Sequence, residues 1–221
     1  MTSGEGTPGD SNASEPDRWK RRVEIAATVL LSAATVLTAW SAFQSTKWSG
    51  IQAIRFSQAS ASRTESVRAS TAAGQQTIAD VTVFTAWLTA TDEGQTHLAG
   101  LLAARFRGEF KAAFEAWEST SPLTNVSAPA TPFATPGYEL ANSRHATKLE
   151  ATASTQFTQA TEANQRADNY ILLTVLFALV LFFGAVSTRF DSRGIQIALL
   201  SVGAVVFVVV AVIAALFPVE F

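Results

Sequence analysis

Three apolar stretches in this chain are each long enough to cross a lipid bilayer, and they constrain its fold more than any other feature. They run from about Val23 to Phe43, from Tyr170 to Val186 and from Ile195 to Phe217. A helix needs about 20 residues to span the hydrocarbon core, and the only charged residue in these stretches is Glu24, at the edge of the first. The sequence therefore predicts an all-α membrane protein with three transmembrane helices.

The first apolar stretch is predicted to be a retained anchor and not a cleaved signal peptide. A basic segment, RWKRR at 18–22, precedes it, as it would in either case. A secretory apolar region is about 7–15 residues long and ends in small residues before the cut. Here the run is longer, and bulky Trp40 and Phe43 flank the only plausible cut, near Ser41. As an anchor, it places Trp40 and Trp48 where interfacial aromatic residues gather.

Basic residues predict the orientation. The segment before the first span and the short loop 187–194, which contains Arg189 and Arg193, both belong on the cytoplasmic side by the positive-inside rule. We therefore expect a disordered cytoplasmic tail at 1–17, an anchor and first span at 18–45, an extracytoplasmic helical domain at 46–169, spans two and three within 170–217, and an outside C-terminus at 218–221.

The outer domain is predicted to be a helical bundle formed partly by helices continuous with spans one and two. We favour four helical passes, with a break at Gly74 and a last helix from Tyr138, capped by Thr135 and Pro136. The alternative is one unbroken helix to Thr91, with the proline-rich loop 120–137 making the return pass. Both arrangements return the chain to the membrane.

A helix from about Asp92 to Ser119 has the clearest amphipathic pattern of the chain. Asp92 and Gln95 have the spacing of a capping box. Large apolar residues recur on one face of this segment: Leu98, Leu102, Phe106, Phe110, Phe114 and Trp117. Such a stripe predicts the core of the outer domain. An aromatic ligand groove is the alternative.

Several segments together resemble a family of bacterial three-span membrane proteins of unknown function. They are RFRGEFKAAFEAW (105–117), SAPATPFATPGY (127–138), ADNYILLTVLFALVLFF (167–183), and TAWSAFQSTKWSG after the first span. The resemblance implies a bacterial cytoplasmic (inner) membrane location. It implies no active-site residues.

No residue constellation predicts an enzyme or a cofactor. The chain has no cysteine and two histidines, and Glu93 with His97 makes at most half a metal site. Phosphate-binding and dinucleotide-binding loops and a nucleophile elbow are absent from the sequence. The net charge of -2 does not suggest nucleic-acid binding.

The first span carries a face of small and hydroxyl-bearing residues: Thr28, Ser32, Thr35, Ala39 and Ala42. Small residues let membrane helices approach closely. This face predicts a contact with the other spans or with a second subunit, or else a polar pore lining. Two functions follow from the sequence. One is a non-enzymatic accessory, scaffold or sensor protein whose outer domain binds a partner or ligand. Its expected partners are the lipid bilayer, further copies of itself in a homo-oligomer, or another membrane protein. The alternative is a homo-oligomeric pore lined by the first span.

Overall fold

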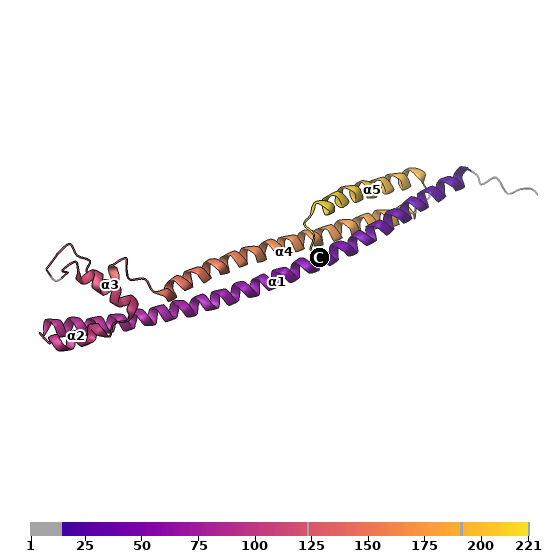
Figure 1. Cartoon of the computed structure of the whole chain (residues 1–221). Coiled ribbons are helices and arrows are strands. Elements are labelled where there is room, and N and C mark those ends of the chain that lie inside the picture. Colours follow the sequence, from indigo (N-terminus) through magenta and orange to yellow (C-terminus); the bar gives the residue numbers. More distant parts are fainter. Residues whose placement is uncertain (1–14, 123, 191, 221) are drawn as a thin grey trace, which may run out of the picture. The chain divides into compact units, whose positions relative to one another are not determined.

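The protein is built from helices, which confirms the predicted α class. The computed structural model describes residues 15–122, 124–190 and 192–220, and these contain no strand. The elements are α1 (Glu15–Asp92), α2 (Thr96–Ala104), α3 (Gly108–Glu118), the short 3-10 helix η1 (Pro132–Ala134), α4 (Ala141–Ser187) and α5 (Arg193–Leu216) (Figure 1). Three of them, α1, α4 and α5, are long and apolar enough to cross a membrane. Residues 1–14 of the predicted tail lie outside this description, and its last three residues, 15–17, belong to α1.

The favoured break at Gly74 is wrong, and the alternative of one unbroken helix is right. Helix α1 continues through Gly74 to Asp92, and the sequence contains no proline between Pro16 and Pro122. A glycine inside a helix costs only about 1 kcal/mol relative to alanine. The helix ends instead at Asp92, two residues before Gly94, whose φ of 73° is left-handed. Gly94 N–H donates to Thr91 O at 3.2 Å and Gln95 N–H to Ala90 O at 2.8 Å, the two bonds of a Schellman motif.

The single helix predicted from Asp92 to Ser119 is also wrong, because it is divided into α2 and α3. Gln95 is the N-cap of α2, and no side chain caps that end, so the predicted capping box does not form. Arg107 has extended backbone angles, φ −62° and ψ 148°, at the start of α3. The last long helix starts at Ala141 and not at Tyr138, and Thr135 ends η1.

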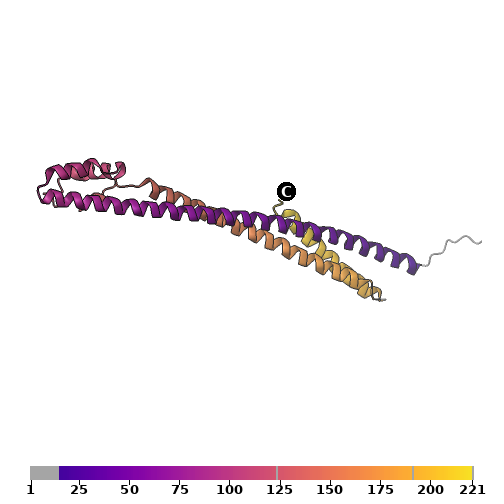
Figure 2. The same ribbon diagram turned by 90° about the horizontal axis from the view of Figure 1, so that it is seen from below.

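The chain divides into two compact units. The membrane unit contains the described residues up to Ala53 and those from Ala160 onward, and the second unit is Ile54–Gln159. Helices α1 and α4 contribute residues to both units. In the membrane unit α4 returns beside α1, and α5 runs back along α4 (Figures 1 and 2). Ring contacts between Phe177 and Phe207, at 6.0 Å, and between Tyr170 and Phe217, at 5.7 Å, establish the antiparallel pairing of α4 and α5.

In the second unit α1 and α4 also run antiparallel. Phe56 meets Phe157 edge-on at 5.4 Å, and Ser66 Oγ donates to Ala146 O at 2.9 Å. Small buried residues recur every seven positions along both helices: Ala59, Ser66 and Ala73 on α1, and Ala146 and Ala153 on α4. A seven-residue repeat keeps one seam of a helix facing its partner. This small-residue seam positions the loop and helices between residues 92 and 141.

Replacing Gly74 with alanine should stabilise the protein. Gly74 is helical and exposed, and a Cβ added there meets nothing within 4 Å. The variant should gain about 1 kcal/mol in free energy of unfolding, from helix propensity. Thermal unfolding of the detergent-solubilised protein measures this. Gly94→Ala is the control and should be destabilising, because its φ is 73°. A destabilised Gly74→Ala variant would contradict the unbroken helix.

Candidate functional site

The second unit has an aromatic core that includes most of the predicted stripe. Phe106, Phe110, Phe114 and Trp117 are buried, together with Phe84 and Trp87 of α1. Leu102 packs against the core at its edge, and Leu98 is 40% exposed. Phe133 of η1 stacks on Phe110 with ring centroids 5.0 Å apart. The central rings are therefore packed against one another and leave no aromatic groove through the stripe itself.

An open pocket lies at the edge of this core. Its walls come from the end of α1, the end of α3 and the segment after it: Trp87, Thr91, Trp117, Glu118, Ser121, Pro122 and Thr124. The rings of Trp87 and Trp117 are 6.3 Å apart and nearly perpendicular, at 77°. Trp117 is held in place because its Nε1 donates to Pro129 O at 2.7 Å. The pocket therefore offers two fixed indole rings, a carboxylate and several hydroxyls.

An ion pair between a buried carboxylate and a partly exposed arginine joins α1 to the start of α3. Asp80 is 3% exposed, and Arg107 binds it through two hydrogen bonds, Nε–Oδ1 at 2.9 Å and Nη2–Oδ2 at 3.0 Å. Tyr138 donates its hydroxyl to Asp80 Oδ2 at 3.0 Å. Burial raises the pKa of Tyr138, and the hydrogen bond to Asp80 raises the pKa of Arg107. Tyr138 therefore stays a neutral donor and Arg107 a cation at ordinary pH.

Glu109 extends this network to the next helix. Its Oε2 lies 3.4 Å from Arg107 Nη2, while its Oε1 accepts a hydrogen bond from the backbone N–H of Ala141 at 2.8 Å. That bond satisfies a free N–H group at the start of α4. The sequence interpretation missed Asp80, Arg107 and Tyr138. The available signal was a charged residue, Asp80, at the position where the seven-residue repeat of Ala59, Ser66 and Ala73 calls for a buried side chain.

The small-residue face predicted on the first span does not pack within the chain. Thr28, Ser32, Thr35, Ala39 and Ala42 are all exposed. The hydroxyls of Thr28 and Thr35 donate to their own helix, to Glu24 O and Leu31 O, each at 2.8 Å. Helix α1 instead buries Ala27, Ala34 and Ser41. The predicted contact with the other spans is therefore wrong, because the packed face is displaced from the predicted one by about 100° around the helix.

Two glycines that the sequence interpretation missed mark the close approaches in the membrane unit. A Cβ on Gly184 would come within 2.9 Å of Leu31 Cδ2, and one on Gly203 within 3.4 Å of Phe183 Cβ. Gly184 therefore lets α4 approach α1, and Gly203 lets α5 approach α4. Ala211 and Ala215, the other small pair of the third span, are partly or fully exposed.

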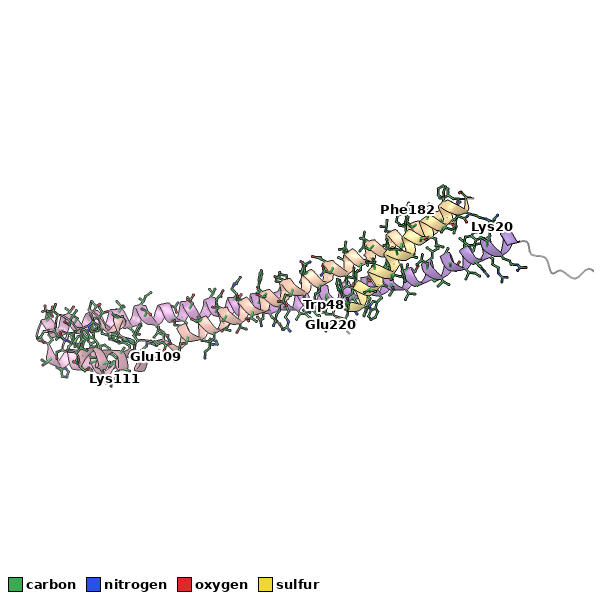
Figure 3. All side chains as sticks on the ribbon, turned by 90° about the horizontal axis from the view of Figure 1, so that it is seen from above. Lys20, Trp48, Glu109, Lys111, Phe182 and Glu220 are labelled. Carbon is green, nitrogen blue, oxygen red and sulfur yellow. The ribbon has the colours of Figure 1, made fainter. Side chains whose placement is uncertain are left out.

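The C-terminal residues Pro218 and Glu220 form hydrogen bonds with side chains of α1 and α4. The fully buried Gln44 exchanges two hydrogen bonds with the backbone of Glu220, both at 2.9 Å. Trp48 Nε1 and Tyr170 Oη donate to Pro218 O at 3.2 and 3.1 Å. Arg166 lies over the Trp48 ring, 4.5 Å from its centroid. Figure 3 shows Trp48 and Glu220 next to each other. Trp48 therefore binds the chain's own end, beyond the interfacial role predicted for it.

The histidines and acidic residues that the sequence singled out form no metal-binding cluster among the described residues. No three histidine or acidic side chains among them lie close enough to hold a metal ion. Glu93 accepts a hydrogen bond from Gln95 at 2.6 Å. His97 and His145 are exposed on different helices, α2 and α4.

The fold and these sites define a helical protein with three helices that are long and apolar enough to span a membrane. No protein-family model matches the chain, and no curated protein or solved structure matches it. The resemblance to bacterial three-span membrane proteins stays a prediction, and the function is argued below from the chain's own residues.

Arg107→Ala should destabilise the second unit by about 3 kcal/mol, because it leaves the buried Asp80 carboxylate without its cation. Arg105→Ala is the matched control, since Arg105 is exposed and forms no ion pair with another described residue. It should cost less than about 0.5 kcal/mol. Near-ultraviolet circular dichroism during thermal unfolding follows the aromatic core directly. Equal effects of the two variants would contradict a structural role for the ion pair.

Proposed function

We propose that this is a non-enzymatic integral membrane protein of the bacterial cytoplasmic membrane, with its N-terminus inside and residues 46–169 outside. The basic segment 18–22 and the loop residues Arg189 and Arg193 support this orientation through the positive-inside rule. The bacterial location rests on the resemblance to three-span proteins. The extracytoplasmic bundle then consists of the second unit and the adjoining parts of α1 and α4.

The outer unit, in this proposal, binds a ligand in the pocket between Trp87 and Trp117. One observation carries the proposal: two fixed indole rings line an open pocket beside the carboxylate of Glu118. Indole faces attract cations, and Glu118 forms no ion pair with another described residue. An apolar body carrying one positive charge fits this lining. The ligand class is therefore an organic cation, such as an amine with an aromatic or aliphatic group.

An accessory or sensor role fits this site better than catalysis does. The described residues that line the pocket include no nucleophile paired with a base and no histidine. Trp87 and Thr91 belong to α1, the same helix that supplies the first apolar span. Ligand binding at the end of α1 therefore acts on an element that continues without a break into the membrane unit.

A homo-oligomeric pore lined by the first span is the second candidate. It is favoured by the exposure of all five residues of the face from Thr28 to Ala42, which leaves that face free for another subunit. A membrane-protein partner could cover the same face. The mass of the detergent-solubilised protein distinguishes the pore from the ligand-binding accessory role. A monomeric mass would exclude a pore lined by the first span of several subunits.

Phenethylammonium should bind the pocket saturably and quench tryptophan fluorescence, while the neutral analogue 2-phenylethanol should bind more weakly. Glu118→Gln should weaken the binding of the amine by about two- to fivefold, as expected for the loss of a partly exposed ion pair. Glu115→Gln is the control, because Glu115 lies on the same helix but outside the pocket lining.

Equal binding of the amine and the alcohol would contradict the proposed ligand class. Absence of saturable binding by either compound would contradict the pocket as the ligand site. An unchanged affinity in Glu118→Gln would remove the role given to its carboxylate.

A further inference from the structure

A basic pocket lies at the end of the membrane unit, between the start of α1 and the start of α5. Arg18, Trp19 and Arg22 of α1 and Arg193 of α5 line its volume of about 330 Å³. None of the three arginines forms an ion pair with another described residue. Trp19 Nε1 is buried and has no acceptor among the described residues. Three guanidinium groups and one indole ring therefore line one space, and no acidic residue among the described ones lines it with them.

An apolar groove continues from this pocket along the seam between α1 and α5. Trp19 and Arg22 also belong to its first section, where they are joined by Val23, Ala26, Ile197, Leu200 and Ser201. Its second section shares Ala26 and Leu200 and adds Val29, Leu30, Ala33, Ala204 and Phe207. From Arg22 to Ala33 the groove follows about 16 Å of helix. This length is about half of a hydrocarbon core of about 30 Å, or one leaflet.

We propose that this pocket and groove form a binding site for one anionic phospholipid. The phosphate lies among Arg18, Arg22 and Arg193, and one acyl chain follows the groove. Guanidinium groups bind phosphate oxygens through paired hydrogen bonds, and three of them line this pocket. Basic pockets between membrane helices on the cytoplasmic side have the chemistry that recognises anionic headgroups.

The lining changes from arginines to aliphatic side chains along the seam between α1 and α5, and this order favours a phospholipid. A phospholipid has an anion at one end and an apolar chain at the other, which matches the order of arginines and then aliphatic side chains. An apolar helix from a second copy supplies no anion for the arginines. Free phosphate fills the basic pocket only and leaves the groove between α1 and α5 uncovered. Asp17 and Asp191 are near the arginines in sequence, but six basic residues occupy 18–22, 189 and 193.

The test uses native mass spectrometry of the full chain in a neutral detergent, with added phosphatidylglycerol, phosphatidylcholine or inorganic phosphate. We expect one phosphatidylglycerol molecule to remain bound, with phosphatidylcholine retained about tenfold less. Arg22→Gln should lower phosphatidylglycerol binding about tenfold. Arg21→Gln removes the same charge from a neighbouring residue outside the pocket lining and should have little effect.

A second variant tests the groove without changing charge. Leu200→Trp fills the groove and should also displace the lipid, while circular dichroism checks that the helices remain. Equal losses in Arg21→Gln and Arg22→Gln would overturn the proposal in favour of general surface electrostatics. Normal lipid binding by Leu200→Trp, with competition by inorganic phosphate, would assign the pocket to free phosphate. A dimer without bound lipid would assign the groove to a second copy and overturn the lipid site.

Discussion

Close packing of small residues between α1 and α4 is the interaction on which each of the two units depends. In the second unit Ala59, Ser66 and Ala73 recur at a seven-residue spacing on α1, and Ala146 and Ala153 do so on α4. In the membrane unit the same role falls to Ala27, Ala34 and Gly184. Lipid provides no hydrophobic drive between membrane helices, so van der Waals contact at short range must hold them there. Larger side chains at these positions would separate the helices and the sites that they carry.

Two buried polar residues, Asp80 and Gln44, lie next to these small-residue contacts on α1. Asp80 follows the small residues of α1 and fixes Arg107, so that α3 starts at a defined place beside the aromatic core. Gln44 fixes the C-terminal backbone in the membrane unit. Both are buried hydrogen-bonded groups, which are costly to leave unpaired and therefore specify one arrangement. The pocket between Trp87 and Trp117 lies at the edge of the aromatic core to which both tryptophans belong.

The sequence predicted the helical class and the three apolar helices, because length and hydropathy alone determine them. It also pointed to Phe106, Phe110, Phe114 and Trp117, which the structure buries. It gave the unbroken α1 only as the alternative, because it overestimated the weak helix-breaking tendency of Gly74. The face from Thr28 to Ala42 and the buried face through Ala27 and Ala34 are both rich in small residues. Composition therefore cannot show which of the two faces is buried. The answer depends on where α4 and α5 pack.

The partners of the buried polar residues had no local signal in the sequence. The ion pair between Asp80 and Arg107 joins residues 27 positions apart, and the bond between Gln44 and Glu220 joins residues 176 apart. Such pairs follow from tertiary packing and not from spacing along a helix. The basic pocket combines two segments that the sequence used only to orient the spans. Their meeting at one end of α1 and α5 requires that the two helices run in the same direction.

Thiol labelling in membrane vesicles tests the three-span account most directly, because the chain has no native cysteine. Gln75→Cys places a thiol on the exposed surface of the second unit, and Ser192→Cys places one between α4 and α5. In right-side-out vesicles an impermeant maleimide should label the variant at position 75 at once, and the variant at 192 only after permeabilisation. Immediate labelling at 192 with protection at 75 would contradict the proposed orientation, and equal immediate labelling of both would contradict the crossing between them.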